Sequence, residues 1–324
     1  MLELHFINVG DGDAILAEYQ KDGSAFRLLV DAGRAEVGTY PPSLRQTAAS
    51  YLRRQAIRRL DAVVVTHLHA DHFGGLAEIL ETVEVGTVFS GFFPDPSAAP
   101  AVRTGTEEKT IKGLLDCLDQ WTEITRALRI RGVRLIRAEG SQPLPTPEGL
   151  QAEIIVPDPE ATARQRTIWE LLLAHKPLSG DMLWWSSKFR NPGSLRVRLG
   201  YAGRRAELAG DCYGAAWESG GAEPCDILKV PHHGDAKALT PELVRKLRPA
   251  HGVISCAAEY LPRKDRPSEQ TALLLEAQGA QVWYTDCFSR PGRRQAERRF
   301  AVDFTITEEG EILPPPAKNN RHPH

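Results

Sequence analysis

The chain has 324 residues, of which 42% are hydrophobic and 25% are charged, and its formal net charge is −2. This size and composition are typical of a folded protein with one large domain or two ordinary ones. The near-neutral charge excludes a global electrostatic attraction to nucleic acid or to an anionic membrane, so any such attraction has to come from local patches.

The N-terminal segment has no basic start and no long apolar run, so we expect no secretory signal, and no apolar stretch is long enough to cross a membrane. The five cysteines are scattered without paired spacing. Such cysteines are typical of buried thiols in a reducing compartment. We therefore expect a cytoplasmic protein without a membrane partner.

The first third of the chain alternates strand-like segments with Gly/Asp turns. Three such segments lie within residues 2–33 with no helical pattern between them, which predicts antiparallel strands. Apolar residues then recur at four-residue spacing, which predicts a helix across Leu44, Ala48, Leu52, Ala56 and Leu60. A strand is expected next, at 62–65.

Helices and strands mix in the rest of the chain. Helices are expected near 75–83, 111–128, 167–176, 240–247 and 268–278, and strands near 85–90, 132–138, 150–158, 194–201, 204–210, 226–231, 252–257, 281–286 and 299–306. Hairpins first and mixed elements later predict an α/β fold with two packed sheets and helices outside.

A cluster of protonatable residues follows the strand at 62–65. His67 and His69 point the same way along an extended chain, and Asp71 and His72 can reach a neighbouring point from the turn that follows. Imidazole and carboxylate groups suit zinc, iron or manganese. A polar loop with incidental histidines is the alternative, but ten histidines in the whole chain make three within six positions improbable by chance.

These residues match the HxHxDH signature of the metallo-β-lactamase fold superfamily, which the chain resembles. It is most similar to the ComEC-type hydrolase domain of competence DNA-uptake proteins and its stand-alone relatives. The landmarks, in order, are "VGDGDA" (9–14), "NPGSLRVRL" (191–199), "AGD" (209–211) and "VPHHG" (230–234). The resemblance implies an αββα four-layer sandwich over residues 1–312, and it fits poorly over about 91–190. That segment is rich in proline and charge, which predicts an inserted helical elaboration beside the site, and the composition of 313–324 predicts a disordered tail.

The resemblance also implies two divalent metal ions, with zinc as the first choice and manganese as the alternative. Asp211 ends a strand where the family places a carboxylate that bridges two metals. His67, His69 and Asp211 would bind the first ion, and Asp71, His72 and Asp211 the second.

One histidine of "VPHHG" would complete the second site. We favour His232 as the ligand and His233 as a proton-handling catalytic partner, although sequence does not separate the two neighbours. Many family members place a third histidine on the first metal before the "AGD" strand, whereas this chain has Asn191. Because an amide oxygen is a poor zinc ligand, the first site would bind weakly or prefer a harder ion.

The implied reaction is hydrolysis by a hydroxide that the two metals generate near neutral pH, with Asp71 orienting it. The resemblance points to phosphodiesters, and so to a nuclease or phosphodiesterase. Lys237 would contact a phosphate oxygen as a catalytic and substrate-binding group, unless it is an ordinary solvated lysine. Asn191 and Arg266 would also bind substrate. Arg266 stands where relatives have histidine, and it could bind an anion but not transfer protons near pH 7.

Nucleic acid is a possible partner through local features. Basic residues cluster at Arg53, Arg54, Arg58 and Arg59 and across 290–299, although such arginine faces are more often solvated. Three aromatic residues before Asn191 could stack on a base or form an ordinary core patch: Trp184, Trp185 and Phe189.

Two further functions stay open. One is a hydrolase of the same fold that acts on a small ester, lactone or choline-phosphate substrate, which an occluding 91–190 segment would favour. The other is a metal-stabilised binding module that lost catalysis through the changes at Asn191, Asp235 and Arg266. The oligomeric state has no signal in the sequence.

Overall fold

The computed structural model describes residues 1–41, 43–105, 107–219, 221–258, 266–287 and 297–316. One sheet begins with the N-terminal hairpins. Its strands are β1 (Leu2–Ile7), β2 (Ile15–Lys21), β3 (Ser24–Val30), β4 (Arg59–Val65), β5 (Glu84–Ser90), β6 (Arg134–Arg137), β14 (Ala301–Ile306) and β15 (Ile312–Leu313). In the described part of the chain their order is β15-β14-β1-β2-β3-β4-β5-β6. β1, β2 and β3 pair antiparallel, as predicted.

The second sheet is built from later segments. Its strands are β7 (Gln142–Pro143), β8 (Leu150–Ile155), β9 (Arg196–Tyr201), β10 (Arg204–Ala209), β11 (Ile227–Lys229), β12 (His251–Ile254) and β13 (Gln281–Tyr284). Among the described residues their order is β13-β12-β11-β10-β9-β8-β7. The strands from β10 to β13 are parallel to one another.

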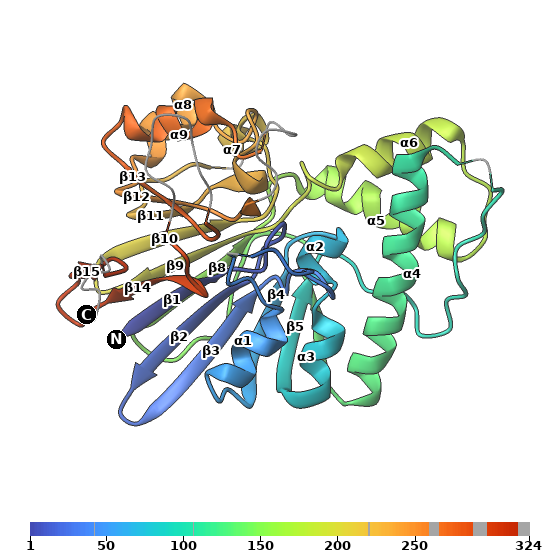
Figure 1. The fold of residues 1–324 in the computed structure, drawn as a ribbon. Coiled ribbons are helices and arrows are strands. Elements are labelled where there is room, and N and C mark those ends of the chain that lie inside the picture. Colours follow the sequence, from blue (N-terminus) through green and yellow to red (C-terminus); the bar gives the residue numbers. More distant parts are fainter. Residues whose placement is uncertain (42, 106, 220, 259–265, 288–296, 317–324) are drawn as a thin grey trace.

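Helices cover the outer faces of both sheets. The helices of the described residues are α1 (Ala48–Arg54), α2 (Ala70–Phe73), α3 (Leu76–Thr82), α4 (Lys109–Ile130), α5 (Pro159–Leu173), α6 (Gly180–Phe189), α7 (Gly214–Ser219), α8 (Pro241–Leu247) and α9 (Glu269–Glu276), with a 3₁₀ turn, η1, at Pro231–Gly234. In Figure 1, α1, α3 and α4 lie on the first sheet and α7, α8 and α9 on the second. The predicted α/β, four-layer αββα architecture is confirmed.

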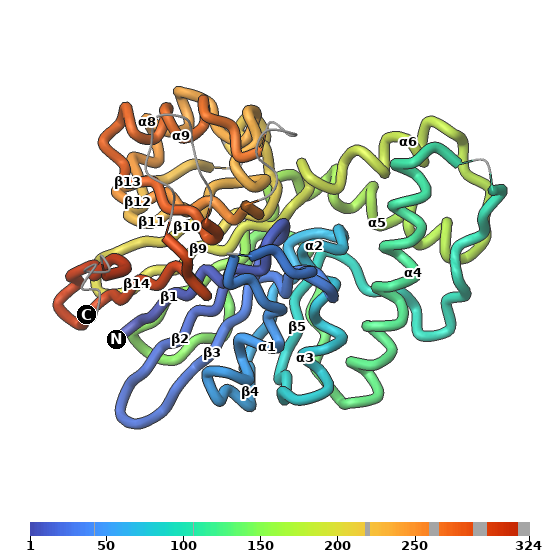
Figure 2. The backbone as a smooth tube through the Cα atoms, viewed as in Figure 1, coloured from blue at the N-terminus to red at the C-terminus, as the bar shows by residue number. Residues whose placement is uncertain are grey.

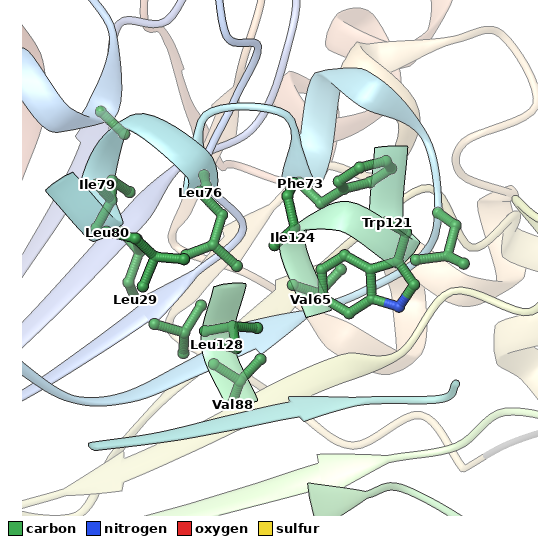
Figure 3. Close-up of a cluster of buried hydrophobic side chains, with 14 of the residues drawn as sticks. Leu29, Val65, Phe73, Leu76, Ile79, Leu80, Val88, Trp121, Ile124 and Leu128 are labelled. Carbon is green, nitrogen blue, oxygen red and sulfur yellow. The ribbon is translucent and has the colours of Figure 1, made fainter. Parts of the chain in front are cut away.

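β4 ends in an apolar run, from Ala62 to Val65, that is buried on both faces. Val63 and Val65 pack into the core between the first sheet and its helices, whereas Ala62 and Val64 face the core between the two sheets. Figure 3 shows the helix-side core, in which Val65 lies near the side chains of α3 and α4. Neither face admits a polar residue over this part of the strand, and each fully buried valine contributes about 1.5–3 kcal/mol.

The helix predicted across Leu44 to Leu60 is shorter than the spacing indicated. α1 begins after Thr47, whose Oγ1 accepts a hydrogen bond from the Ser50 N–H at 3.2 Å. It ends before Ala56, which has a left-handed backbone with φ of 56°. Leu60 belongs to β4. The four-residue spacing of apolar residues therefore extends over a helix, a turn and a strand. The sequence patterns did not predict α6, α7, β7 or β15.

The segment 91–190 contributes strands to both sheets. β6 extends the first sheet by pairing with β5, and β8 extends the second by pairing with β9. The helices of the segment, α4, α5 and α6, lie together at one end of the sandwich (Figure 2). That the segment is an inserted elaboration stays a prediction. Of the expected disordered tail, residues 317–324 lie outside the described residues. No helix among the described residues is long and apolar enough to cross a membrane.

Candidate metal centre

The candidate ligands come from loops that follow parallel strands of both sheets. His67, His69 and His72 follow β4, Asp211 follows β10, and His233 follows β11. β3 and β4 are parallel in the first sheet, and β10 and β11 are parallel in the second. Parallel strands end at the same edge of a sheet, so residues distant in sequence converge there.

The first cluster contains His67, His69 and Asp211, whose candidate ligand atoms all lie within 4.8 Å of one another. His67 Nε2 lies 2.8 Å from His69 Nδ1 and 3.7 Å from Asp211 Oδ2. Burial lowers the pKa of both histidines, that of His69 to about 3, with a further contribution from Arg190 at His69. Neutral imidazoles are the form that binds a metal.

The Thr66 hydroxyl explains which nitrogen of His67 is free. Thr66 Oγ1 donates to Asp31 Oδ2 at 2.8 Å, so it can only accept from His67 Nδ1, which lies 3.1 Å away. His67 Nε2 is then left without a proton, facing His69. Close approach also explains Gly210, because a Cβ there would lie 2.5 Å from Thr66 Oγ1.

The second cluster contains His72, Asp211, His233 and Asp13 within the same 4.8 Å limit. His72 Nδ1 donates to Asp31 Oδ2 at 2.7 Å, which leaves Nε2 facing Asp211 Oδ1 at 3.4 Å. His233 Nε2 lies 3.5 Å from Asp71 Oδ2 and 3.9 Å from Asp211 Oδ1. His72 Nε2, Asp211 Oδ1 and His233 Nε2 are buried and have no hydrogen-bond partner in the described part of the chain.

The charges of these groups fit a divalent cation. Burial alone would raise the pKa of Asp211, but His72 and His233 hold it well below its usual range. Burial opposes a charge on His72, yet Asp211 and Asp31 outweigh it and raise its pKa. Protons on the imidazoles thus offset the carboxylates, and a metal ion that replaced those protons would satisfy the same buried atoms.

Asp13 serves the second cluster from the other side of the rings. Asp13 Oδ2 lies 3.6 Å from His72 Nδ1, Oδ1 lies 3.9 Å from His233 Nδ1, and the fully buried Lys229 ammonium pairs with Oδ2. It therefore contacts the nitrogens that point away from Asp211, which is a position for orienting the rings. Sequence reasoning gave Asp13, Asp31 and Lys229 no role, although Asp13 lies within the quoted "VGDGDA".

The backbone of "PHHG" decides where its histidines point. His232 and His233 have left-handed conformations with φ of 47° and 54°, which cost of order 1–3 kcal/mol each in non-glycine residues. His233 enters the second cluster. His232 Nε2 instead accepts from Arg266 Nη1 at 2.8 Å and contacts Asn191 Nδ2 at 3.1 Å. The geometry favours His233 as the ligand, whereas sequence reasoning favoured His232.

His232, Asn191 and Arg266 form an edge beside the first cluster. Asn191 Nδ2 donates to Asp211 Oδ2 at 3.3 Å, and His232 Nε2 lies 3.6 Å from the same oxygen. Asn191 therefore lies next to the cluster, as the resemblance implied. The Lys237 side chain is exposed, and the hydrogen bonds described for this residue use its backbone: its N–H donates to Asp235 Oδ1, and its carbonyl accepts from the Gly214 N–H. The roles of Asn191, Arg266 and Lys237 with substrate stay predictions.

The basic and aromatic residues that could contact nucleic acid lie in different surroundings. Arg53 lies 3.7 Å from Glu78, and Arg59 pairs with Asp61 and Glu84, as expected of solvated faces. Residues 288–296 of the second basic stretch lie outside the described residues. Trp185 stacks on Phe189 at a centroid distance of 4.9 Å, whereas Trp184 is 51% exposed on the same helix.

Asp31→Asn is expected to weaken metal binding about 10- to 100-fold, the usual effect of losing a hydrogen-bond partner of a metal-bound histidine. The asparagine could still accept from one donor but would no longer fix His72 and Thr66 together. Chelator competition with zinc measures the effect. Asp61→Asn, which removes a carboxylate from the Arg59 pair at the far end of β4, should bind zinc normally, and equal losses in both variants would contradict the assignment.

Comparisons with known proteins agree with the resemblance seen in the sequence. Residues 7–88 match the family model described as the metallo-beta-lactamase superfamily. The ComE operon protein 3 of Bacillus subtilis (strain 168) is 23% identical over 300 residues, which cover 88% of this chain and 32% of that protein. The chain thus spans about a third of that relative's length. The predicted resemblance is confirmed.

The chain also matches solved structures at low sequence identity. The metallo-beta-lactamase fold protein YhfI from Bacillus subtilis is 10% identical, with a TM-score of 0.44 over 88% of this chain and 96% of that chain. Zn(2+)-bound PqqB from Methylobacterium extorquens is 11% identical, with a TM-score of 0.44 over 88% of this chain and 98% of that chain.

Proposed function

We propose that this chain is a metal-dependent hydrolase that holds two divalent ions and cleaves phosphodiester bonds. One observation carries the proposal: two groups of buried ligand atoms share the carboxylate of Asp211. His67 and His69 would hold one ion on its Oδ2 side, and His72 and His233 the other on its Oδ1 side. Zinc suits these ligands, and manganese is the alternative.

When bound, a pair of such ions lowers the pKa of a water molecule and stabilises the charge that develops on the substrate. The protein's own groups do the rest. Asp71, whose Oδ2 lies 3.5 Å from His233 Nε2, would accept a proton and orient the attacking water. Asp31 holds the imidazole of His72 through a hydrogen bond to Nδ1, and Asp13, 3.9 Å from His233 Nδ1, would orient the second ring by its charge.

An anionic substrate is supported by the donors at the edge of the cluster. Arg266 is a permanent cation, and its Nη1 donates to His232 beside Asp211. Its remaining N–H groups suit the non-bridging oxygens of a phosphate, and Asn191, whose Nδ2 contacts His232 at 3.1 Å, lies at the same edge. The resemblance to the competence-type hydrolase domain also supports cleavage of a phosphodiester bond. DNA and choline-phosphate diesters are the candidate substrates.

The purified protein, supplied with zinc or manganese, is expected to bind two ions per chain and to release p-nitrophenol from bis(p-nitrophenyl) phosphate. His69→Ala should lose this activity. His175→Ala, which removes an exposed histidine outside both clusters, is the matched control and should keep it. Metal binding without turnover of any phosphodiester would reject the phosphodiesterase and leave the small-substrate hydrolase and the binding module.

A small substrate is the second candidate because side chains of α5 and α6 lie beside the first cluster, where they restrict the space for a polymer. The cavity left there is lined by His67, Arg190 and the aromatic side chains of Phe92, Trp169 and Phe189. Its volume of about 30 Å³ holds no more than a water molecule, so a substrate would have to enter the cluster from another side. Faster turnover of small esters or lactones than of phosphodiesters, in the same assay, would favour this candidate.

A further inference from the structure

Arg190 is a buried arginine that sequence reasoning passed over. It directly follows α6, and 7% of its surface is exposed. Its Nη1 donates to the Leu68 carbonyl at 3.1 Å, and its Nε approaches the Ser187 carbonyl at 3.4 Å. Leu68 lies between His67 and His69, so a side chain from the helical elaboration reaches the backbone of the ligand loop.

The surroundings of Arg190 lack the usual compensation for a buried charge. Among the described residues, no carboxylate oxygen lies within 4.0 Å of its guanidinium. The neighbouring Cys117 is no substitute, because burial raises the pKa of its thiol even though Arg190 acts in the opposite direction. A buried cation without an ion pair is costly, so its hydrogen bonds to backbone carbonyls are its main compensation.

We propose that Arg190 is a positioning residue for the first metal site, an inference that rests on the proposed function. Its bond to the Leu68 carbonyl fixes the peptide that links the two histidine ligands, and so fixes the direction of both imidazoles. The bond also connects α4 and α6 to the ligand loop, which makes the elaboration a structural part of the metal centre. Such outer partners hold ligands in the geometry that the ion requires.

The charge of Arg190 acts against this effect. A guanidinium near His69 repels a bound cation, while its hydrogen bonds favour the ligand geometry. Two substitutions separate the contributions. Arg190→Met removes both the charge and the bonds. Arg190→Lys keeps the charge but cannot reach the carbonyls of Leu68 and Ser187 with one planar group.

The experiment measures zinc binding by chelator competition, without substrate. Arg190→Met is expected to bind the first-site ion about 10- to 100-fold more weakly while the second ion is retained, and Arg190→Lys should fall between it and the unchanged protein. Arg129→Met is the control, because Arg129 lies on α4 and also donates to a backbone carbonyl, that of Pro94 at 2.8 Å. It should bind both ions normally.

Wild-type zinc affinity in Arg190→Met, or tighter binding, would overturn the inference, because the charge would then outweigh the positioning. Equal weakening in Arg190→Met and Arg129→Met would also overturn it and indicate a general packing effect. If Arg190→Met does not fold, wild-type binding in Arg190→Lys decides against the inference. Failure of the proposed function is distinct, since the unchanged protein would then bind no metal or hydrolyse nothing.

Discussion

Asp211→Asn is expected to remove metal from both sites and to lower phosphodiester hydrolysis by at least about 10³-fold, more than the roughly 10- to 100-fold typical of an outer partner. Asp211 Oδ2 lies 3.7 Å from His67 Nε2, and Oδ1 lies 3.4 Å from His72 Nε2. Asparagine replaces one of these oxygens by an N–H₂ group, which cannot bind a metal. It also removes the negative charge that offsets the mutual repulsion of two cations.

Elemental analysis and a phosphodiester assay measure this result together. Asp303→Asn is a suitable control, because Asp303 is a half-exposed carboxylate that contacts His5 at 2.8 Å on the first sheet. It should retain both ions and full activity. Two ions per chain in Asp211→Asn would contradict the shared-carboxylate arrangement and, with it, the main support for the proposed function.

The part of the site that sequence predicts well is local. His67, His69 and His72 lie in one short motif just after β4, and His67 and His69 share a cluster, as expected from the sequence. The backbone there is a bend rather than an extended chain, because the His69 N–H donates to the His67 carbonyl at 3.1 Å. Asp211 likewise lies just beyond the end of β10. For such residues the position at the end of a strand, rather than alternation along it, indicates the site.

The choice between His232 and His233 is not local in this way. Both residues have left-handed backbones, which no pattern of apolar residues announces, and alternation fails for them. Asp31 and Arg190 were missed for a related reason. Each acts on a partner far away in the chain, His72 and Leu68 respectively, and only the packing of the two sheets and the elaboration brings the pairs together.

The fold shows the same difference between features set by regular sequence patterns and features set by single residues. Long amphipathic α4 and the paired strands came directly from periodicity, because their burial is regular along the element. The helix predicted from Leu44 to Leu60 failed because its ends depend on a cap at Thr47 and a left-handed turn at Ala56. Single residues determine where this helix begins and ends, and the periodicity of apolar residues does not indicate them.

His233→Asn is expected to lower the metal content from about two ions per chain to about one and to reduce phosphodiester hydrolysis about 10³-fold, since paired metals act together. His233 Nε2 is buried beside Asp71 and Asp211 and has no hydrogen-bond partner among the described residues, so the second ion would lose one imidazole ligand. His232→Asn is expected to keep both ions, because His232 Nε2 is occupied by Arg266 and Asn191.

Asparagine makes the comparison fair, because it tolerates a left-handed backbone and both variants therefore carry similar conformational strain. His232→Asn should still weaken substrate binding, because Arg266 loses the acceptor that orients it. We therefore expect mainly a higher KM. The opposite pattern, with metal lost in His232→Asn and kept in His233→Asn, would restore His232 as the ligand. That outcome would leave the shared role of Asp211 unchanged.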